Sequence, residues 1–205
     1  MSESAGRALP NARVRRFMLA IQDVMGQSGL AAVLRQAGLQ RFVSALPPAN
    51  DKLGLRAAEY AALTQAIENY YGRGARGTLL RIGYASFNRL VVAQSFTAGF
   101  YRQVLRLLPI QNRKVLTLRL LARDLASPRG RVSVHRDDHR LKLVDYESDA
   151  TVGRHRDIEI CWVTLGEIQE SLKWGTGLEY DVSELSCKAR GEPACRFEIR
   201  DPLGA

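Results

Sequence analysis

The hydrophobic pattern of this 205-residue chain changes its period close to Gly130. Before that point apolar side chains recur every three or four residues, the spacing of one helix face, and Val14 and Phe17 begin the first such stripe. After it they alternate, as at Val132 and Val134, which is the spacing of a strand. The chain is therefore expected to be an α+β protein, with N-terminal helices packed on a C-terminal, mostly antiparallel sheet.

Turn residues divide both halves into shorter elements. Helices are expected over residues 14–25, 30–37, 57–71, 78–93, 100–108, 111–126 and 166–174. Strands are expected in a hairpin around the turn 136–139, and over 158–162, 180–185 and 195–199. The small residues Gly83, Ala85 and Ser86 predict that another element approaches the 78–93 helix closely.

The length fits one compact domain, since a typical domain has roughly 150 residues. Residues 12–200 are expected to form it, with residues 1–11 as a flexible N-terminal tail and residues 201–205 as a C-terminal tail. Every stretch without a charged residue is shorter than the roughly 18 apolar residues of a membrane span. No membrane span is expected, and the predicted location is cytoplasmic.

The net charge of +9 is unevenly distributed, because residues 1–130 are strongly basic and residues 131–205 are acidic. A basic half can attract nucleic acid, anionic lipid or an acidic partner. The arginines are dispersed along helical pattern, which favours a solvated surface, and no helix-turn-helix, zinc-finger or RNA-recognition motif accompanies them. Direct nucleic-acid binding is not expected.

Residues 72–77 match the phosphate-binding pattern G-x-G-x-x-G. That pattern acts between a strand and a helix with an acidic residue about 20 positions later, whereas here a helix precedes it. No acidic residue occurs between Glu68 and Asp124. The segment is interpreted as an interhelical turn, and an anion site formed by Arg73 and Arg76 is the alternative.

Catalytic residues cannot be assigned from the sequence. The only histidines, His135, His139 and His155, are interpreted as exposed loop residues. There is no G-x-S-x-G motif and no cysteine beside a histidine. Whether the chain is an enzyme is left open, with a binding protein preferred.

The three cysteines Cys161, Cys187 and Cys195 all lie in the C-terminal third, and an odd number argues against a disulfide framework. Three thiols in one predicted sheet suggest zinc, with Glu184 as a fourth tetrahedral ligand. A spacing of three places Glu184 and Cys187 on opposite faces of a regular strand, so the site needs a bulge, turn or strand end between them. The alternative is three buried cysteines that act as small hydrophobic side chains.

The segment Tyr180 to Ile199 (YDVSELSCKARGEPACRFEI) resembles the C-terminal signature of the 4-vinyl reductase domain family, with the match carried by its Cys, Gly and Cys-x-Phe positions. The segment Gly74 to Phe87 resembles the central helix of that family. The resemblance implies a ligand-binding α+β fold shared with transport-protein-particle subunits and haem nitric-oxide-binding domains.

Related domains in phenol-sensing transcription activators hold zinc with a Cys, a Glu and two further Cys. The resemblance places these ligands at Cys161, Glu184, Cys187 and Cys195, and four protein ligands imply a structural zinc. The resemblance covers the sensor part alone, and the residues that grip phenol in those sensors have no secure counterpart. Aromatic candidates for a pocket, each also compatible with core packing, are Tyr84, Phe87, Phe96, Phe100, Trp162 and Trp174.

The expected function is the binding of a small hydrophobic or aromatic molecule in an enclosed pocket braced by zinc, as a stand-alone sensor or carrier. A homodimer is expected from the resemblance. The alternative is an accessory protein or reductase acting on a tetrapyrrole vinyl group in bacteriochlorophyll synthesis, although no nucleotide or flavin motif supplies a hydride source. A scaffold that binds an acidic partner through its basic helices is a third hypothesis.

Overall fold

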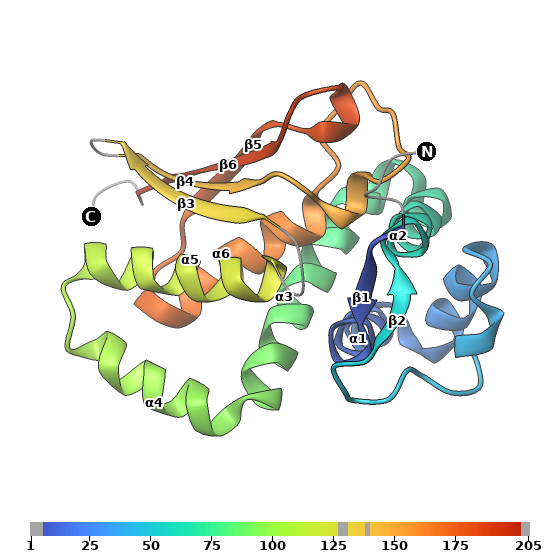
Figure 1. Cartoon of the computed structure of the whole chain (residues 1–205), viewed down its shortest axis with the longest axis horizontal. Coiled ribbons are helices and arrows are strands. Elements are labelled where there is room, and N and C mark those ends of the chain that lie inside the picture. The colour runs from blue at the N-terminus through green and yellow to red at the C-terminus, as the bar shows by residue number, and fades with distance from the viewer. Residues whose placement is uncertain (1–5, 127–130, 138–139, 202–205) are drawn as a thin grey trace.

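The computed structural model describes residues 6–126, 131–137 and 140–201 (Figure 1). The helices are α1 (Asn11–Gln36), α2 (Ala57–Tyr71), α3 (Ala75–Ala93), α4 (Ser95–Arg106), α5 (Ile110–Ala126) and α6 (Trp162–Thr176). The strands are β1 (Ala8–Pro10), β2 (Leu53–Arg56), β3 (Val132–Asp137), β4 (Arg140–Asp145), β5 (Asp181–Ser186) and β6 (Cys195–Arg200). The expected α+β class, with helices before the main sheet, is confirmed.

The main sheet has the strand order β3-β4-β6-β5, and every neighbouring pair is antiparallel. Leu143 lies opposite Phe197, and both are fully buried because helices α5 and α6 cover this face (Figure 1). The predicted hairpin is present as β3 and β4, and residues 138 and 139 of its turn lie outside the described residues.

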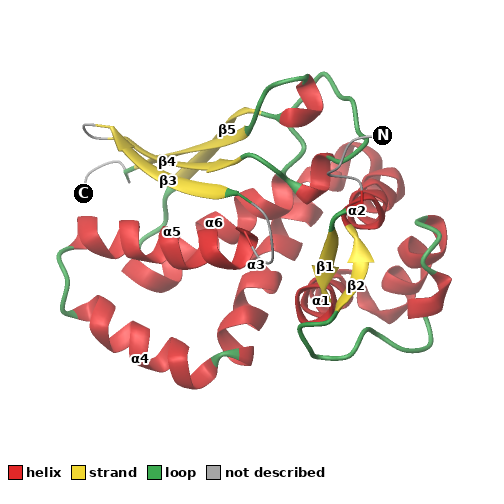
Figure 2. Ribbon diagram, viewed as in Figure 1, coloured by secondary structure: helices red, strands yellow, loops and turns green. Residues whose placement is uncertain are grey.

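A second, two-stranded sheet pairs β1 with β2 (Figure 2). Leu9 lies opposite Leu55, and each side chain is 1% exposed because both enter the core formed with α1, α2 and α3. This corrects the expectation of a flexible tail through residue 11, since a single buried leucine is too short a pattern to reveal a strand.

The two helices expected over residues 14–25 and 30–37 both lie within α1. Gly26 has φ 73° and ψ 172°, which are non-helical values, so the predicted break at this glycine is confirmed as a kink that divides α1. By length and apolar composition alone α1 is the one described helix that could cross a membrane. Its stripe Phe17, Met18 and Ile21 is instead buried against the neighbouring helices, as in a core helix.

The strand expected over residues 158–162 is wrong, because the chain there is irregular and α6 already begins at Trp162. The backbone N–H of Cys161 donates to Oε2 of Glu184 over 3.0 Å, so a side chain takes the place of a strand partner. Ile158 is 56% exposed, whereas Ile160 is buried. Alternation over three apolar residues therefore did not reflect a strand.

Helices α3 and α6 cross in direct backbone contact. A Cβ atom on Gly83 would lie 2.3 Å from the carbonyl oxygen of Val163, and one on Gly166 would lie 2.4 Å from that of Leu80. The close approach predicted at Gly83 is confirmed. Because Gly83 and Gly166 have no side chain, the two helices form one rigid unit between the two hydrophobic cores.

Candidate metal centre and binding cleft

The structure brings the four predicted metal-ligating side chains together. Cys161 precedes α6, Glu184 lies on β5, and Cys187 and Cys195 lie at the facing ends of β5 and β6. Their ligand atoms all lie within 4.8 Å of one another. The Sγ atom of Cys161 is 3.3 Å from that of Cys195 and 3.9 Å from that of Cys187, and none of the three thiols forms a disulfide.

The backbone meets the geometric requirement derived from the sequence. The register of β5 against β6 shifts between Glu184 and Ser186, and the strand ends at Ser186. This bulge and strand end bring Glu184 and Cys187 to the same ion position. A short 3₁₀ turn and Gly191, at φ 88°, then return the chain to Cys195.

The cluster is deeply buried, and its acid groups interact strongly. Each thiol is at most 1% exposed. Burial, together with the neighbouring Cys187, raises the pKa of Glu184 to about 9. Hydrogen bonds from Cys161 and Cys195 lower the pKa of Cys187. The hydrogen bond between Cys161 and Cys187 in turn raises the pKa of Cys161. Four such groups cannot all ionise by themselves, whereas a divalent cation would favour their charged forms.

The donor set fits a tetrahedral divalent cation. Bonds near 2.3 Å from zinc to sulfur place tetrahedral sulfurs about 3.8 Å apart, and the two sulfur separations above, 3.3 Å and 3.9 Å, bracket that value. Oε1 of Glu184 is buried and has no hydrogen-bond partner among the described residues. A carboxylate oxygen without a partner beside three thiols is consistent with a fourth ligand, so the cluster can hold a metal ion.

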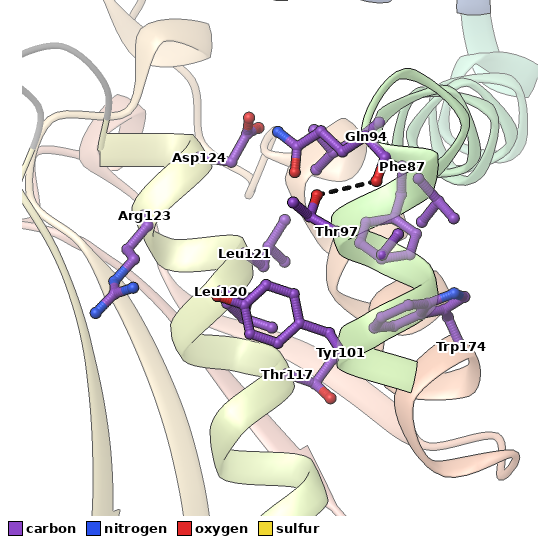
Figure 3. Close-up of a pocket in the computed structure, with 13 residues that line it drawn as sticks. Phe87, Gln94, Thr97, Tyr101, Thr117, Leu120, Leu121, Arg123, Asp124 and Trp174 are labelled. Atoms are coloured by element: carbon purple, nitrogen blue, oxygen red, sulfur yellow. Dashed lines mark hydrogen bonds between the residues drawn. The ribbon is translucent and has the colours of Figure 1, made fainter. Parts of the chain in front are cut away.

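A cleft of about 600 Å³ lies between helices α3, α4, α5 and α6 (Figure 3). Phe87 and Trp174 form one wall, with ring centroids 6.1 Å apart and an edge-to-face angle of 66°. Leu120 and Leu121 of α5 form the facing wall, and the ring of Tyr101 reaches from α4 toward it (Figure 3). The walls are thus mainly apolar and aromatic, as in small-molecule sites.

Polar groups border this cleft at its edges. The Thr97 hydroxyl donates to the carbonyl of Gln94, the residue before α4, over 3.0 Å. Asp124 is held by the guanidinium of Arg16 from α1 in an ion pair. Tyr101 and Thr117 make no side-chain hydrogen bond to another described residue, so their hydroxyls are polar groups available to a ligand.

The six aromatic pocket candidates are not brought together. Phe87 and Trp174 line the cleft, whereas Tyr84 donates to Gln169 on the neighbouring helix over 2.7 Å. Trp162 packs against the N-terminal core at the other end of α6. The expectation that all six aromatic residues line one pocket is therefore wrong, since the cleft contains two of them.

Phe96 and Phe100 face away from the cleft, with 90% and 65% of each residue exposed. They lie four positions apart on the outer side of α4, and the inner side presents Thr97 and Tyr101 instead. Sequence reasoning missed Tyr101, because a tyrosine directly after an exposed phenylalanine carries no signal about which side of the helix faces inward.

The remaining motifs take simple structures. Residues 72–77 form a 3₁₀ turn and the first turn of α3 after helix α2, so the requirement of the phosphate pattern for a preceding strand is not met. His135 lies on β3 rather than in a loop and shares a 2.7 Å hydrogen bond with Ser133. His155 is an exposed loop residue, and His139 lies outside the described residues.

No protein-family model matches this sequence, and no curated protein matches it. Several solved structures match its fold. An H-NOX protein from S. oneidensis in its Fe(II)NO ligation state has a TM-score of 0.57 and 10% identity, over 91% of this chain and 97% of that one. A single-residue variant of Tt H-NOX has a TM-score of 0.58 and 13% identity, over 96% of this chain and 98% of that one.

The phenol-responsive sensory domain of the transcription activator PoxR, solved with phenol, has a TM-score of 0.53 and 18% identity, over 72% of this chain and 75% of that one. At these identities the likeness concerns the fold. The chain therefore has the α+β fold of H-NOX domains and of this sensory domain.

Proposed function

We propose that this chain binds a small apolar or aromatic molecule in the cleft between α3, α4, α5 and α6, as a stand-alone sensor or carrier. The observation that carries the proposal is the pairing of an aromatic wall, Phe87 and Trp174, with a leucine wall across a space of about 600 Å³. An apolar ligand there would be removed from water on two sides, and Tyr101 would orient a polar substituent.

Haem does not fit the cleft well, although it occurs in the H-NOX family. The described lining side chains include no histidine, cysteine or methionine, the usual axial ligands of haem iron. Among the described lining residues, Tyr101 is the only one of a type that serves as an axial ligand of haem iron. We therefore propose a ligand without a metal. The test below also includes tetrapyrroles, because the resemblance to the 4-vinyl reductase domain family implies a tetrapyrrole role as the alternative.

The second part of the proposal is a structural zinc ion held by Cys161, Glu184, Cys187 and Cys195. Four protein ligands leave no position open for substrate, so zinc there would join α6, β5 and β6 rather than act on the ligand. The support is the donor geometry and the buried, unpartnered Oε1 of Glu184.

Tryptophan fluorescence tests the cleft, because the chain has only two tryptophans and they lie at opposite ends of α6. In the Trp162→Phe variant, Trp174 alone reports on the cleft. We expect titration with naphthalene or phenol to change the emission of Trp174 saturably. We expect Leu120→Trp to weaken the binding of the same probes, measured by absorbance. Saturable binding of haem or a chlorophyllide alone would replace the proposal, and binding of none of these would refute it.

Metal analysis of protein purified without chelator tests the zinc. We expect about one zinc per chain, lost in Glu184→Gln and retained in Glu192→Gln, a matched change of an exposed glutamate in the β5–β6 connection. Less than about one zinc per two chains in the unmodified protein would contradict the proposal. The predicted homodimer is tested on the same sample by sedimentation.

A further inference from the structure

A second cavity, of about 520 Å³, lies at the opposite end of α6 from the cleft. The turn after α2 contributes Arg73 to its lining, the first turn of α3 contributes Arg76, and Trp162 is the first residue of α6. Strand β5, at the edge of the main sheet, contributes Val182 and Ser183. Nothing in the proposed function uses this cavity.

The lining of this cavity holds both basic and acidic side chains. Of the acidic ones, Glu159 lies 2.5 Å from Arg190, and Asp181 points to Arg200 at 3.8 Å, an arginine that also contacts another carboxylate. Arg73 and Arg76 are exposed and make no ion pair with any residue in the described ranges.

No acidic residue stands nearby in the sequence to change this balance, because none occurs between Glu68 and Asp124. Glu184 also borders the cavity, but its Oε2 accepts the Cys161 N–H and its ligand atom lies with the thiols. The two guanidinium groups are therefore the basic groups of the lining that are left without an ion pair among the described residues.

The rest of the lining is suited to an apolar body. Leu165 and Val182 are buried residues that border the cavity, and Trp162 is partly buried beside them. The hydroxyl of Ser183 adds a hydrogen-bonding group. Guanidinium groups bind carboxylates and phosphates with paired, charge-assisted hydrogen bonds, and tryptophan offers a face for an aromatic ring.

We propose that this cavity is a second binding site, for a small organic anion. Its carboxylate or phosphate would lie between Arg73 and Arg76, and its apolar body would lie against Trp162 and Val182. The site is independent of the cleft, because the two cavities share no lining residue.

The test uses the Trp174→Phe variant, in which Trp162 is the only tryptophan. Its emission is followed during titration with 2-naphthoate, with 2-naphthyl phosphate, and with the uncharged 2-naphthamide. We expect the anions to bind saturably and the amide at least about tenfold more weakly, since charge-assisted hydrogen bonds are lost. The better of the two anions identifies the preferred head group.

The deciding variant is Arg73→Ala/Arg76→Ala in the same background, and we expect it to weaken anion binding at least about tenfold. Arg102→Ala/Arg106→Ala removes the same charge from exposed positions on α4 and should leave binding unchanged. Circular dichroism checks that both variants fold, and Arg73→Lys/Arg76→Lys should retain part of the affinity. Equal anion binding in both alanine variants, equal binding of the amide, or no saturable change at millimolar anion would each overturn the proposal.

Discussion

The cluster of Cys161, Glu184, Cys187 and Cys195 is closely packed, whereas the cleft is open, although both lie beside helix α6. Beside the first residue of α6, four side chains from separated segments converge until their ligand atoms lie within 4.8 Å, and the thiols are almost fully excluded from water. Near its last residues, the cleft keeps about 600 Å³ open, and its outer wall α4 buries only Leu105. The N-terminal end of α6 is therefore closely packed by the cluster, whereas its C-terminal end faces helix α4, which buries few of its own residues.

This difference separates stability from binding. Bonds from a buried cluster to one ion would lock the sheet and α6 together, so that loss of a ligand residue unfolds structure. The cleft contributes less to folding, because open apolar surface is not removed from water until a ligand enters. Changes in the cluster should therefore alter stability most, and changes in the cleft should alter binding most.

The largest effect is expected from Cys187→Ser. Loss of a buried ligand should release the metal and lower Tm by about 10 °C or more, since a structural metal contributes several kcal/mol and each corresponds to about 2–4 °C at this size. Differential scanning fluorimetry and metal analysis measure both quantities. Ser148→Ala is the control, because its hydroxyl lies 3.5 Å from the Cys161 sulfur without being a ligand. An unchanged Tm in Cys187→Ser would contradict the contrast drawn above.

A smaller loss of stability is expected from Gly166→Ala. The new Cβ would lie 2.4 Å from the carbonyl oxygen of Leu80, so the α3–α6 crossing must separate, at a cost of about 1–3 kcal/mol. Gly99→Ala on α4 meets nothing within 4 Å and should be neutral or stabilising by up to about 1 kcal/mol. Urea unfolding of both variants measures the difference, and equal stability would show that the crossing is not rigid.

Leu120→Trp should separate binding from stability. The larger side chain fills the cleft, so affinity for a neutral aromatic probe should fall at least about tenfold, while Tm changes by only about 2 °C. Phe96→Ala, at a residue 90% exposed on the outer side of α4, should leave affinity unchanged. Calorimetric titration of the two variants gives the comparison. Loss of affinity in Phe96→Ala alone would place the ligand outside the cleft.

The smallest effect concerns the buried Glu167 on α6, which accepts a 2.7 Å hydrogen bond from Ser86. Burial raises the pKa of this carboxyl above its ordinary 4.5, despite the opposing charge of Arg16. An acid with a raised folded-state pKa binds protons more tightly when folded, so stability declines as pH rises above 4.5. Glu167→Gln lacks this decline, so its Tm relative to the unmodified protein should rise as the pH increases above 4.5, and parallel Tm curves would contradict the assignment.

The sequence was most informative where side chains carry their own chemistry. The α+β class followed from the change of period near Gly130, and three cysteines with Glu184 predicted a cluster whose required bulge is present. The close helix contact at Gly83 also followed, because a residue without a side chain in an apolar helix face leaves room for a neighbouring backbone.

Tertiary contacts decided what the sequence could not. The stretch 158–162 alternates like a strand, yet its backbone bonds to the Glu184 side chain, which lies far away in the sequence. Helix α4 has Leu105 as its one buried residue, so the exposure of Phe96 and the inward position of Tyr101 were not encoded in a local pattern. Leu9 found a strand partner only through Leu55.

Under the proposed binding role, the glycine contact between α3 and α6 would also limit how ligands of different size are accommodated. Phe87 and Trp174 belong to these two helices, and the helices cannot slide or spread without breaking backbone contact at Gly83 and Gly166. A larger ligand would then obtain space by displacing α4. Selectivity for molecular size would accordingly be set by how readily that one helix yields, and its sequence is the place to alter it.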